Sequence, residues 1–132
     1  MKVLALDYGA ARTGVAVSDA TGAIARPLGV VERAATEAGL TRLAEIVREN
    51  DVEVVVVGLP LTLRGERGKQ AVETEEFVEM LRRALDVAVE TYDERFTTSI
   101  AAASPGAAPE DARAAAHLLE SYLARASSEP RA

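Results

Sequence analysis

The chain contains no cysteine and no tryptophan, and only 4% of its residues are aromatic. Without cysteine it can form neither a disulfide nor a thiolate metal site, which fits the reducing cytoplasm. Its one histidine, His117, excludes zinc motifs built on histidine pairs. The longest apolar run, residues 54–63, is interrupted by Gly58 and Pro60 and is far shorter than the roughly 20 residues that cross a membrane. We therefore expect a soluble cytoplasmic protein that binds no membrane.

The length, 132 residues, is that of one domain, and 48% hydrophobic content is enough for a buried core. We predict a single domain over residues 1–126 and a disordered tail over residues 127–132. Basic residues number 15 and acidic residues 21, so the net charge is −6. Such a chain repels phosphates on average, which argues against indiscriminate binding to nucleic acid but allows a local basic site.

The first quarter of the chain predicts strands. Three apolar segments, at residues 3–8, 14–19 and 23–32, are separated by short polar or glycine-containing stretches. The turn between the second and the third contains Gly22, as hairpin turns often do. These segments predict an antiparallel β-meander.

The rest of the chain alternates helices and strands. A helix capped by Thr36 precedes a continuous valine strand of the buried type. Further along come a second helix, a fifth strand and a last helix with Pro109 in its first turn. The predicted segments after Thr36 are a helix to about residue 50, a strand at 52–58, a helix around 77–85, a strand at 87–92 and the last helix. This order implies an α/β fold of the ribonuclease H type, with a mixed five-stranded sheet and helices on both faces.

Asp7 is the first candidate site residue. It ends an apolar strand and opens the pattern D-x-G-x-x-x-x-G, whose glycines are Gly9 and Gly14. Glycine lets a phosphate or metal approach the sheet edge, and Arg12 in the same turn offers a fork for phosphate oxygens. The alternative is an ordinary hairpin turn in which Asp7 accepts backbone N–H bonds.

Asp93 and Glu94 form the second candidate, where the fifth strand ends. The ends of parallel strands border the crevice in which open α/β sheets bind ligands. Because side chains alternate along a strand, the two carboxylates cannot point the same way. One should bind a ligand and the other should pair, with Arg95 as a candidate partner. A solvated turn with a helix cap at Thr97 or Thr98 is the alternative.

Asp111 is the third candidate. Its neighbours at helical spacing are Ala115, Leu118 and Tyr122, a largely apolar face on which a charge needs a partner. Alternatively, Asp111 only complements the helix dipole in a first turn.

The loop over residues 58–70 carries Arg64, Arg67 and Lys69 against a single Glu66. Its local charge is therefore opposite to that of the chain. Such a loop beside carboxylates could hold a nucleic-acid backbone while the carboxylates hold a metal. A flexible solvated crossover is the alternative.

Several separated motifs occur in a fixed order along residues 3–123. They read LALDYGAARTGVAVSD from Leu4, ARPL from Ala25, VVVGLPL from Val55, DERFTT from Asp93, and D-x-x-x-A-A-x-x-L-E-S-Y-L from Asp111. In this combination the chain resembles the YqgF/RuvX family, the Holliday junction resolvase-like proteins associated with maturation of the small-subunit ribosomal RNA precursor. The family's acidic positions fall on Asp7, the Asp93–Glu94 pair and Asp111.

The resemblance implies a metal-dependent nuclease that acts in maturation of the 5′ end of pre-16S rRNA. In such an enzyme two divalent cations about 4 Å apart activate water and stabilise the leaving oxygen, and an all-oxygen site suits Mg²⁺ or Mn²⁺. The expected ligands and catalytic residues are Asp7, Asp93, Glu94 and Asp111. The expected nucleic-acid contacts are Arg12, Arg64, Arg67, Lys69 and Arg95.

Structured RNA is favoured over branched DNA as the substrate, with ribosomal precursor particles as a candidate partner. The alternatives are a Holliday junction resolvase and a non-catalytic assembly factor. A non-catalytic assembly factor is considered because the chain departs from the family between Thr98 and Asp111. This segment is shorter than in the family and lacks its basic stretch. A phosphotransferase of the actin and sugar-kinase type is disfavoured, since those proteins close two such domains around ATP.

Overall fold

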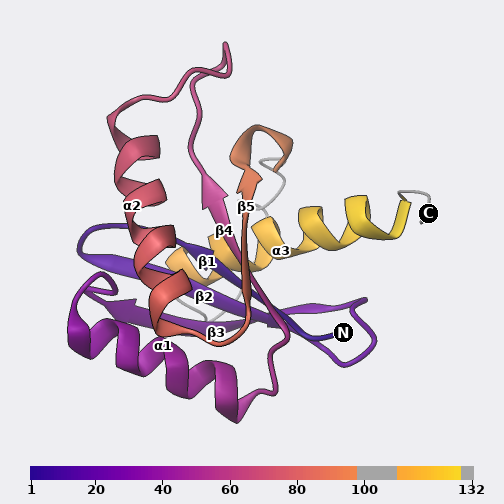
Figure 1. Ribbon diagram of the computed structural model, residues 1–132. Helices are drawn as coiled ribbons and strands as arrows, with labels where there is room; N and C mark the ends of the chain where they lie inside the picture. Colours follow the sequence, from indigo (N-terminus) through magenta and orange to yellow (C-terminus); the bar gives the residue numbers. More distant parts are fainter. Residues whose placement is uncertain (98–109, 129–132) are drawn as a thin grey trace.

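A computed structural model describes residues 1–97 and 110–128 of the chain. The described part contains one five-stranded sheet, three α-helices and a short 3-10 helix, η1 (Figure 1). In chain order the elements are β1 (Val3–Asp7), β2 (Arg12–Ser18), β3 (Ala25–Glu32), α1 (Glu37–Glu49), β4 (Val54–Leu59), α2 (Lys69–Ala84), β5 (Ala88–Asp93), η1 (Glu94–Phe96) and α3 (Glu110–Ser128).

The sheet has the strand order β3-β2-β1-β4-β5. Strands β1, β2 and β3 pair antiparallel, which confirms the predicted meander. Strand β4 pairs parallel with β1 on one side and with β5 on the other. The mixed sheet is therefore as predicted, and the ends of β1, β4 and β5 meet at one edge.

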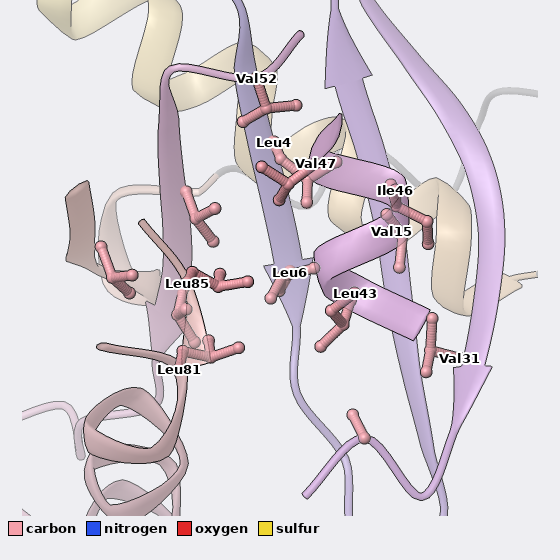
Figure 2. Packing of buried hydrophobic residues seen from close by; sticks show 14 of the residues in the cluster. Leu4, Leu6, Val15, Val31, Leu43, Ile46, Val47, Val52, Leu81 and Leu85 are labelled. Carbon is pink, nitrogen blue, oxygen red and sulfur yellow. The ribbon is translucent and has the colours of Figure 1, made fainter. Parts of the chain in front are cut away.

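Helices α1 and α2 cover one face of the sheet. Helix α1 begins where the sequence predicts, because the Thr36 side chain accepts a hydrogen bond from Gly39 N at 3.1 Å. Its buried residues Leu43, Ile46 and Val47 pack on the sheet beside Leu81 and Leu85 at the end of α2 (Figure 2). Large aliphatic side chains fill this layer, which is the main core.

Helix α3 covers the opposite face, where the packing residues are smaller. Ala115 and Ala116 of α3 lie against Ala5 and Ala16 of the sheet. The contact is closest at Gly14, where a Cβ atom would lie only 1.8 Å from the backbone oxygen of Asp111. Glycine at this position therefore allows the first turn of α3 to rest on β2.

The end of the last helix differs from the sequence prediction. Helix α3 continues to Ser128, so residues 127 and 128 are helical and not part of a tail. The last turns of α3 are anchored, since the guanidinium of Arg125 lies 3.9 Å from the centre of the Phe96 ring. Pro109, Thr98 and residues 129–132 lie outside the described residues. In the ranges 1–97 and 110–128, no helix is long and apolar enough to span a membrane.

Candidate functional site

Asp7 lies at the end of the central strand β1, on the face that α3 covers. Its strand neighbours on that face, Val3 and Ala5, are buried in the α3 cluster, and Gly14 is its partner on β2. Burial raises the pKa of Asp7, and the negative charge of Asp111 raises it further. A hydrogen bond with Glu94 acts in the opposite direction. Asp7 is therefore a half-buried acid with two other acids close by.

Glu94 reaches Asp7 from η1, the turn that follows β5. Its side chain lies over Gly58 of β4, where a Cβ atom would come within 2.7 Å of Oε1. Burial raises the pKa of Glu94 to about 7, with the charge of Asp7 as the next cause. Gly14 on β2 and Gly58 on β4, on either side of β1, thus make room for the acids.

Asp93 points elsewhere, because β5 ends at Asp93 and Glu94 already belongs to η1, so strand alternation does not decide between them. Its carboxylate accepts a hydrogen bond from Arg95 N at 2.9 Å and forms an ion pair with Arg95 Nη2 at 2.6 Å. These bonds hold the pKa of Asp93 below its usual value. Asp93 therefore caps η1 and pairs with Arg95, and Glu94 is the carboxylate that meets Asp7.

Asp111 approaches from the first turn of α3. Its backbone rests on Gly14, and its charge is close enough to raise the pKa of Asp7. The Asp111 carboxylate is paired with Arg12, whose Nε lies 3.3 Å from Oδ2. The structure thus brings Asp7, Glu94 and Asp111 to one sheet edge from three different elements.

These three acids fit a divalent cation by their chemistry. Carboxylate oxygens suit Mg²⁺ or Mn²⁺. The pKa values of Asp7 and Glu94 are raised first by burial and then by the neighbouring negative charges, which a bound cation would offset. Among residues 1–97 and 110–128, no three acidic or histidine side chains already surround a common point. Glu94 is hydrogen-bonded to Asp7, and Asp111 is paired with Arg12. Binding of a cation would replace both contacts.

A cavity of about 300 Å³ opens beside the Asp7–Glu94 pair. Its wall includes Tyr8, whose ring stacks on Phe77 at 4.3 Å between centroids and is fixed against α2. The residues that line the cavity are Asp7, Tyr8, Gly9, Ala10, Pro60, Gln70, Glu73, Thr74 and Glu94.

Three of these lining residues, Gln70, Glu73 and Thr74, were not expected at the site. They follow the i, i+3, i+4 spacing of one helix stripe, and this was the available signal. The sequence does not tell which end of the sheet that stripe faces. The sequence prediction also placed Gln70 in the loop over residues 58–70 and the helix around residues 77–85, whereas α2 begins at Lys69.

The predicted basic contacts fall into two groups. Arg12, Arg67 and Arg95 are paired within the protein, Arg67 with Glu75 at 2.5 Å. Arg64 and Lys69 are exposed, and in the described part of the chain neither has an acidic partner within 4.0 Å.

The loop that carries Arg64 is ordered by its own hydrogen bonds. Gly65 N donates to Thr62 O at 2.8 Å, and Glu66 N donates to the Thr62 hydroxyl at 3.0 Å. Gly65 has a positive φ of 81°, which glycine adopts without strain. Figure 1 shows this loop between β4 and α2 rising away from the sheet. It stands beside η1, because Arg95 Nη1 lies 3.5 Å from Leu63 O.

Solved structures with the same fold define its class. "T. thermophilus RuvC in complex with Holliday junction substrate" matches with a TM-score of 0.67 and 19% identity, over 97% of each chain. "Thermus thermophilus RuvC structure" matches with a TM-score of 0.60 and 21% identity, over 97% of this chain and 98% of that one. The fold is ribonuclease H-like, as the sequence predicts.

The family model described as "RuvX: Holliday junction resolvase" matches residues 1–125, and the chain belongs to this family. A relative from Chloroflexus aurantiacus is 47% identical over 96 residues, 73% of this chain and 63% of the relative. One from Desulforudis audaxviator is 44% identical over 99 residues, 75% of this chain and 70% of the relative. Both are named "Putative pre-16S rRNA nuclease". The match thus spans less than two thirds of the Chloroflexus protein.

Proposed function

We propose that this protein is a divalent-metal-dependent nuclease of the cytoplasm that hydrolyses phosphodiester bonds in structured RNA. Its proposed role is maturation of the 5′ end of pre-16S rRNA in ribosomal precursor particles. The observation that carries the proposal is the Asp7–Glu94 pair, two acids with raised pKa values held together at the open end of the parallel strands. The names of the relatives support RNA as the substrate.

Asp7, Glu94 and Asp111 would hold the cation in this proposal. Bound Mg²⁺ or Mn²⁺ supplies activation of the attacking water and stabilisation of the leaving oxygen. Asp93 has a different part from the one first expected: through Arg95 it fixes η1 and so orients Glu94. The adjacent cavity is where the cleaved phosphate and its neighbouring sugar would lie.

The decisive experiment is incubation of labelled structured RNA with the protein, with and without Mn²⁺. The change Asp7→Asn keeps the shape of the side chain and removes its charge, so cleavage should be abolished while the fold persists. Asp86→Asn, an exposed acid that lies outside the site cavity, is the matched control and should cut normally. Unchanged cleavage by the Asp7 variant would contradict the proposal.

Arg64 and Lys69 are proposed to hold the phosphate backbone without reading bases. Their joint change to Ala should flatten the log–log salt dependence of RNA binding by about two units, roughly one for each lost phosphate contact. Arg67→Ala should change the slope less, since Arg67 is already paired with Glu75. If all these variants show the same salt dependence as the wild-type protein, the loop is not part of the binding surface.

Branched DNA is the second candidate substrate, favoured by the family's description as a Holliday junction resolvase. A four-way DNA junction in the same assay distinguishes the two substrates. Binding of RNA or junction without any cleavage would instead favour a non-catalytic assembly factor.

A further inference from the structure

The position of Glu94 depends on η1, which is only three residues long. So short a 3-10 turn has little stability of its own. One backbone hydrogen bond closes it, from Thr97 N to Glu94 O at 3.0 Å. The contacts that η1 makes with other elements must therefore decide where the Glu94 carboxyl lies.

A chain of hydroxyl groups connects η1 to α3. Ser121 Oγ donates to the backbone oxygen of Phe96 at 3.0 Å, and Tyr92 Oη lies 2.8 Å from Ser121 Oγ. A serine hydroxyl has a single proton, which here is directed to Phe96. Tyr92 must then be the donor to Ser121, so the order is Tyr92 to Ser121 to Phe96.

Ring contacts reinforce the same junction. The rings of Tyr92 and Phe96 lie 5.9 Å apart, and Tyr92 meets Tyr122 edge-on at 5.7 Å. The guanidinium of Arg125 covers the Phe96 ring from α3. The end of η1 is thus attached to α3 by both polar and aromatic contacts.

Ser121 and Asp111 both belong to α3, and Asp111 lies ten positions before Ser121. A contact that fixes η1 on α3 therefore also fixes Glu94 relative to Asp111. We propose that Ser121, with Tyr92 as its donor, is a positioning residue that holds η1 against α3 and sets the spacing of the acids. What the acids bind rests on the proposed function, whereas the attachment of η1 does not.

Two measurements on the full-length, metal-free protein test this role. The first is hydrogen exchange of the Arg95 and Thr97 amides, which are bonded within η1. The second is the dissociation constant for Mn²⁺ alone, by calorimetry. Ser121→Ala removes the exposed hydrogen bond to Phe96 O and the part-buried one from Tyr92. It should speed exchange and weaken Mn²⁺ binding, each about three- to tenfold.

Further variants separate positioning from a general loss of stability. Tyr92→Phe should give a smaller effect in the same direction, and its combination with Ser121→Ala should add nothing, because both act through one bond to Phe96. Ser121→Thr keeps the hydroxyl and should restore both measurements. Ser18→Ala is the matched control: its hydroxyl accepts from Val3 N at 2.8 Å, at the other end of the sheet.

The outcomes are distinct. Equal behaviour of the Ser121→Ala and Ser18→Ala variants, or failure of the threonine variant to recover, would overturn the positioning role. If the wild-type protein binds no Mn²⁺, the metal site fails while amide exchange still decides whether Ser121 holds η1. If the alanine variant does not fold, Tyr92→Phe, which removes one oxygen atom, provides the same comparison.

Discussion

The two faces of the sheet are built from different kinds of residue. The face under α1 and α2, with Leu4 and Leu6 from β1, is filled by large aliphatic side chains. The face under α3 is lined by small residues such as Ala5 and Ala16, and it carries the acids. Small residues let a helix backbone come close to the sheet, and this closeness puts Asp111 beside Asp7.

This difference suggests that one face supplies stability and the other places the site. Large side chains contribute more transfer free energy when they are buried. The acids on the α3 face carry like charges, which repel one another. If the two faces are independent, a change on one face should leave the contribution of the other unaltered.

The largest effect on stability is expected from the α1 face. Leu43→Ala should lower the free energy of unfolding by about 2–5 kcal/mol, since Leu43 is fully buried and leaves a cavity. Urea denaturation measures the free energy of unfolding of the variant, and the Mn²⁺ increment is the difference between its values with and without Mn²⁺. The Mn²⁺ increment should stay the same, and a reduced increment would show that the faces are coupled.

On the α3 face, Gly14→Ala should lower the free energy of unfolding by about 1–3 kcal/mol through overpacking. The added Cβ would overlap the backbone of Asp111, so α3 must shift and the Mn²⁺ increment should also fall. Gly68→Ala is the control, because no other atom lies within 4 Å of a Cβ at that position. If the variant loses stability but keeps the wild-type Mn²⁺ increment, the site does not depend on the close approach of α3 to Gly14.

The pH dependence of stability should report on Glu94. Its pKa is about 7 in the fold against 4.5 for the ordinary group, so the folded protein binds this proton more tightly. The resulting stability is present below pH 4.5 and is lost as the pH rises through 7. We expect a loss of about 1–2 kcal/mol, less than the full shift implies because solvent reaches the pair.

Glu94→Gln should remove this slope, measured as unfolding free energy at several pH values without metal. The exposed Glu53, at the opposite end of β4, provides the control Glu53→Gln, which should retain it. A slope of the same size in both variants would mean that other groups cause it.

The smallest effect on stability is expected for Arg12→Ala. The Arg12–Asp111 pair is exposed and should be worth less than about 1 kcal/mol. Its loss frees Asp111, so Mn²⁺ affinity should rise by up to about fivefold. Arg42→Ala removes a similarly exposed arginine paired with Glu45 and Glu49 on α1 and should leave Mn²⁺ binding unchanged. Weaker Mn²⁺ binding without Arg12 would contradict this reading of the ion pair.

Much of the fold could be predicted because its signals are local. Thr36 caps its helix by a bond three residues away, and the valine run of β4 is apolar on both faces wherever it lies. For the candidate site, the sequence indicates which acids to consider but not which of them lie in contact. The sequence leaves open whether Asp93 or Glu94 meets Asp7, and only the turn of η1 over Gly58 decides for Glu94.

The pairing of Arg12 and Arg67 could not be predicted for a related reason. Arg12 pairs with an acid far along the chain, so its partner depends on how whole elements dock. Arg67 is followed by a helix with several acids, and the sequence does not tell that Glu75 is the one it meets. Arg12 on β2 meets Asp111 only because α3 crosses that strand.

The order of the elements along the chain has a consequence for synthesis. Helix α3 follows all five strands, and it carries Asp111 and Ser121. A growing chain can pair β1 with β2 early, yet it has no complete set of acids until α3 has left the ribosome and docked. In the proposed nuclease, the acids that would hold the cation are therefore brought together only once the last described helix has been synthesised.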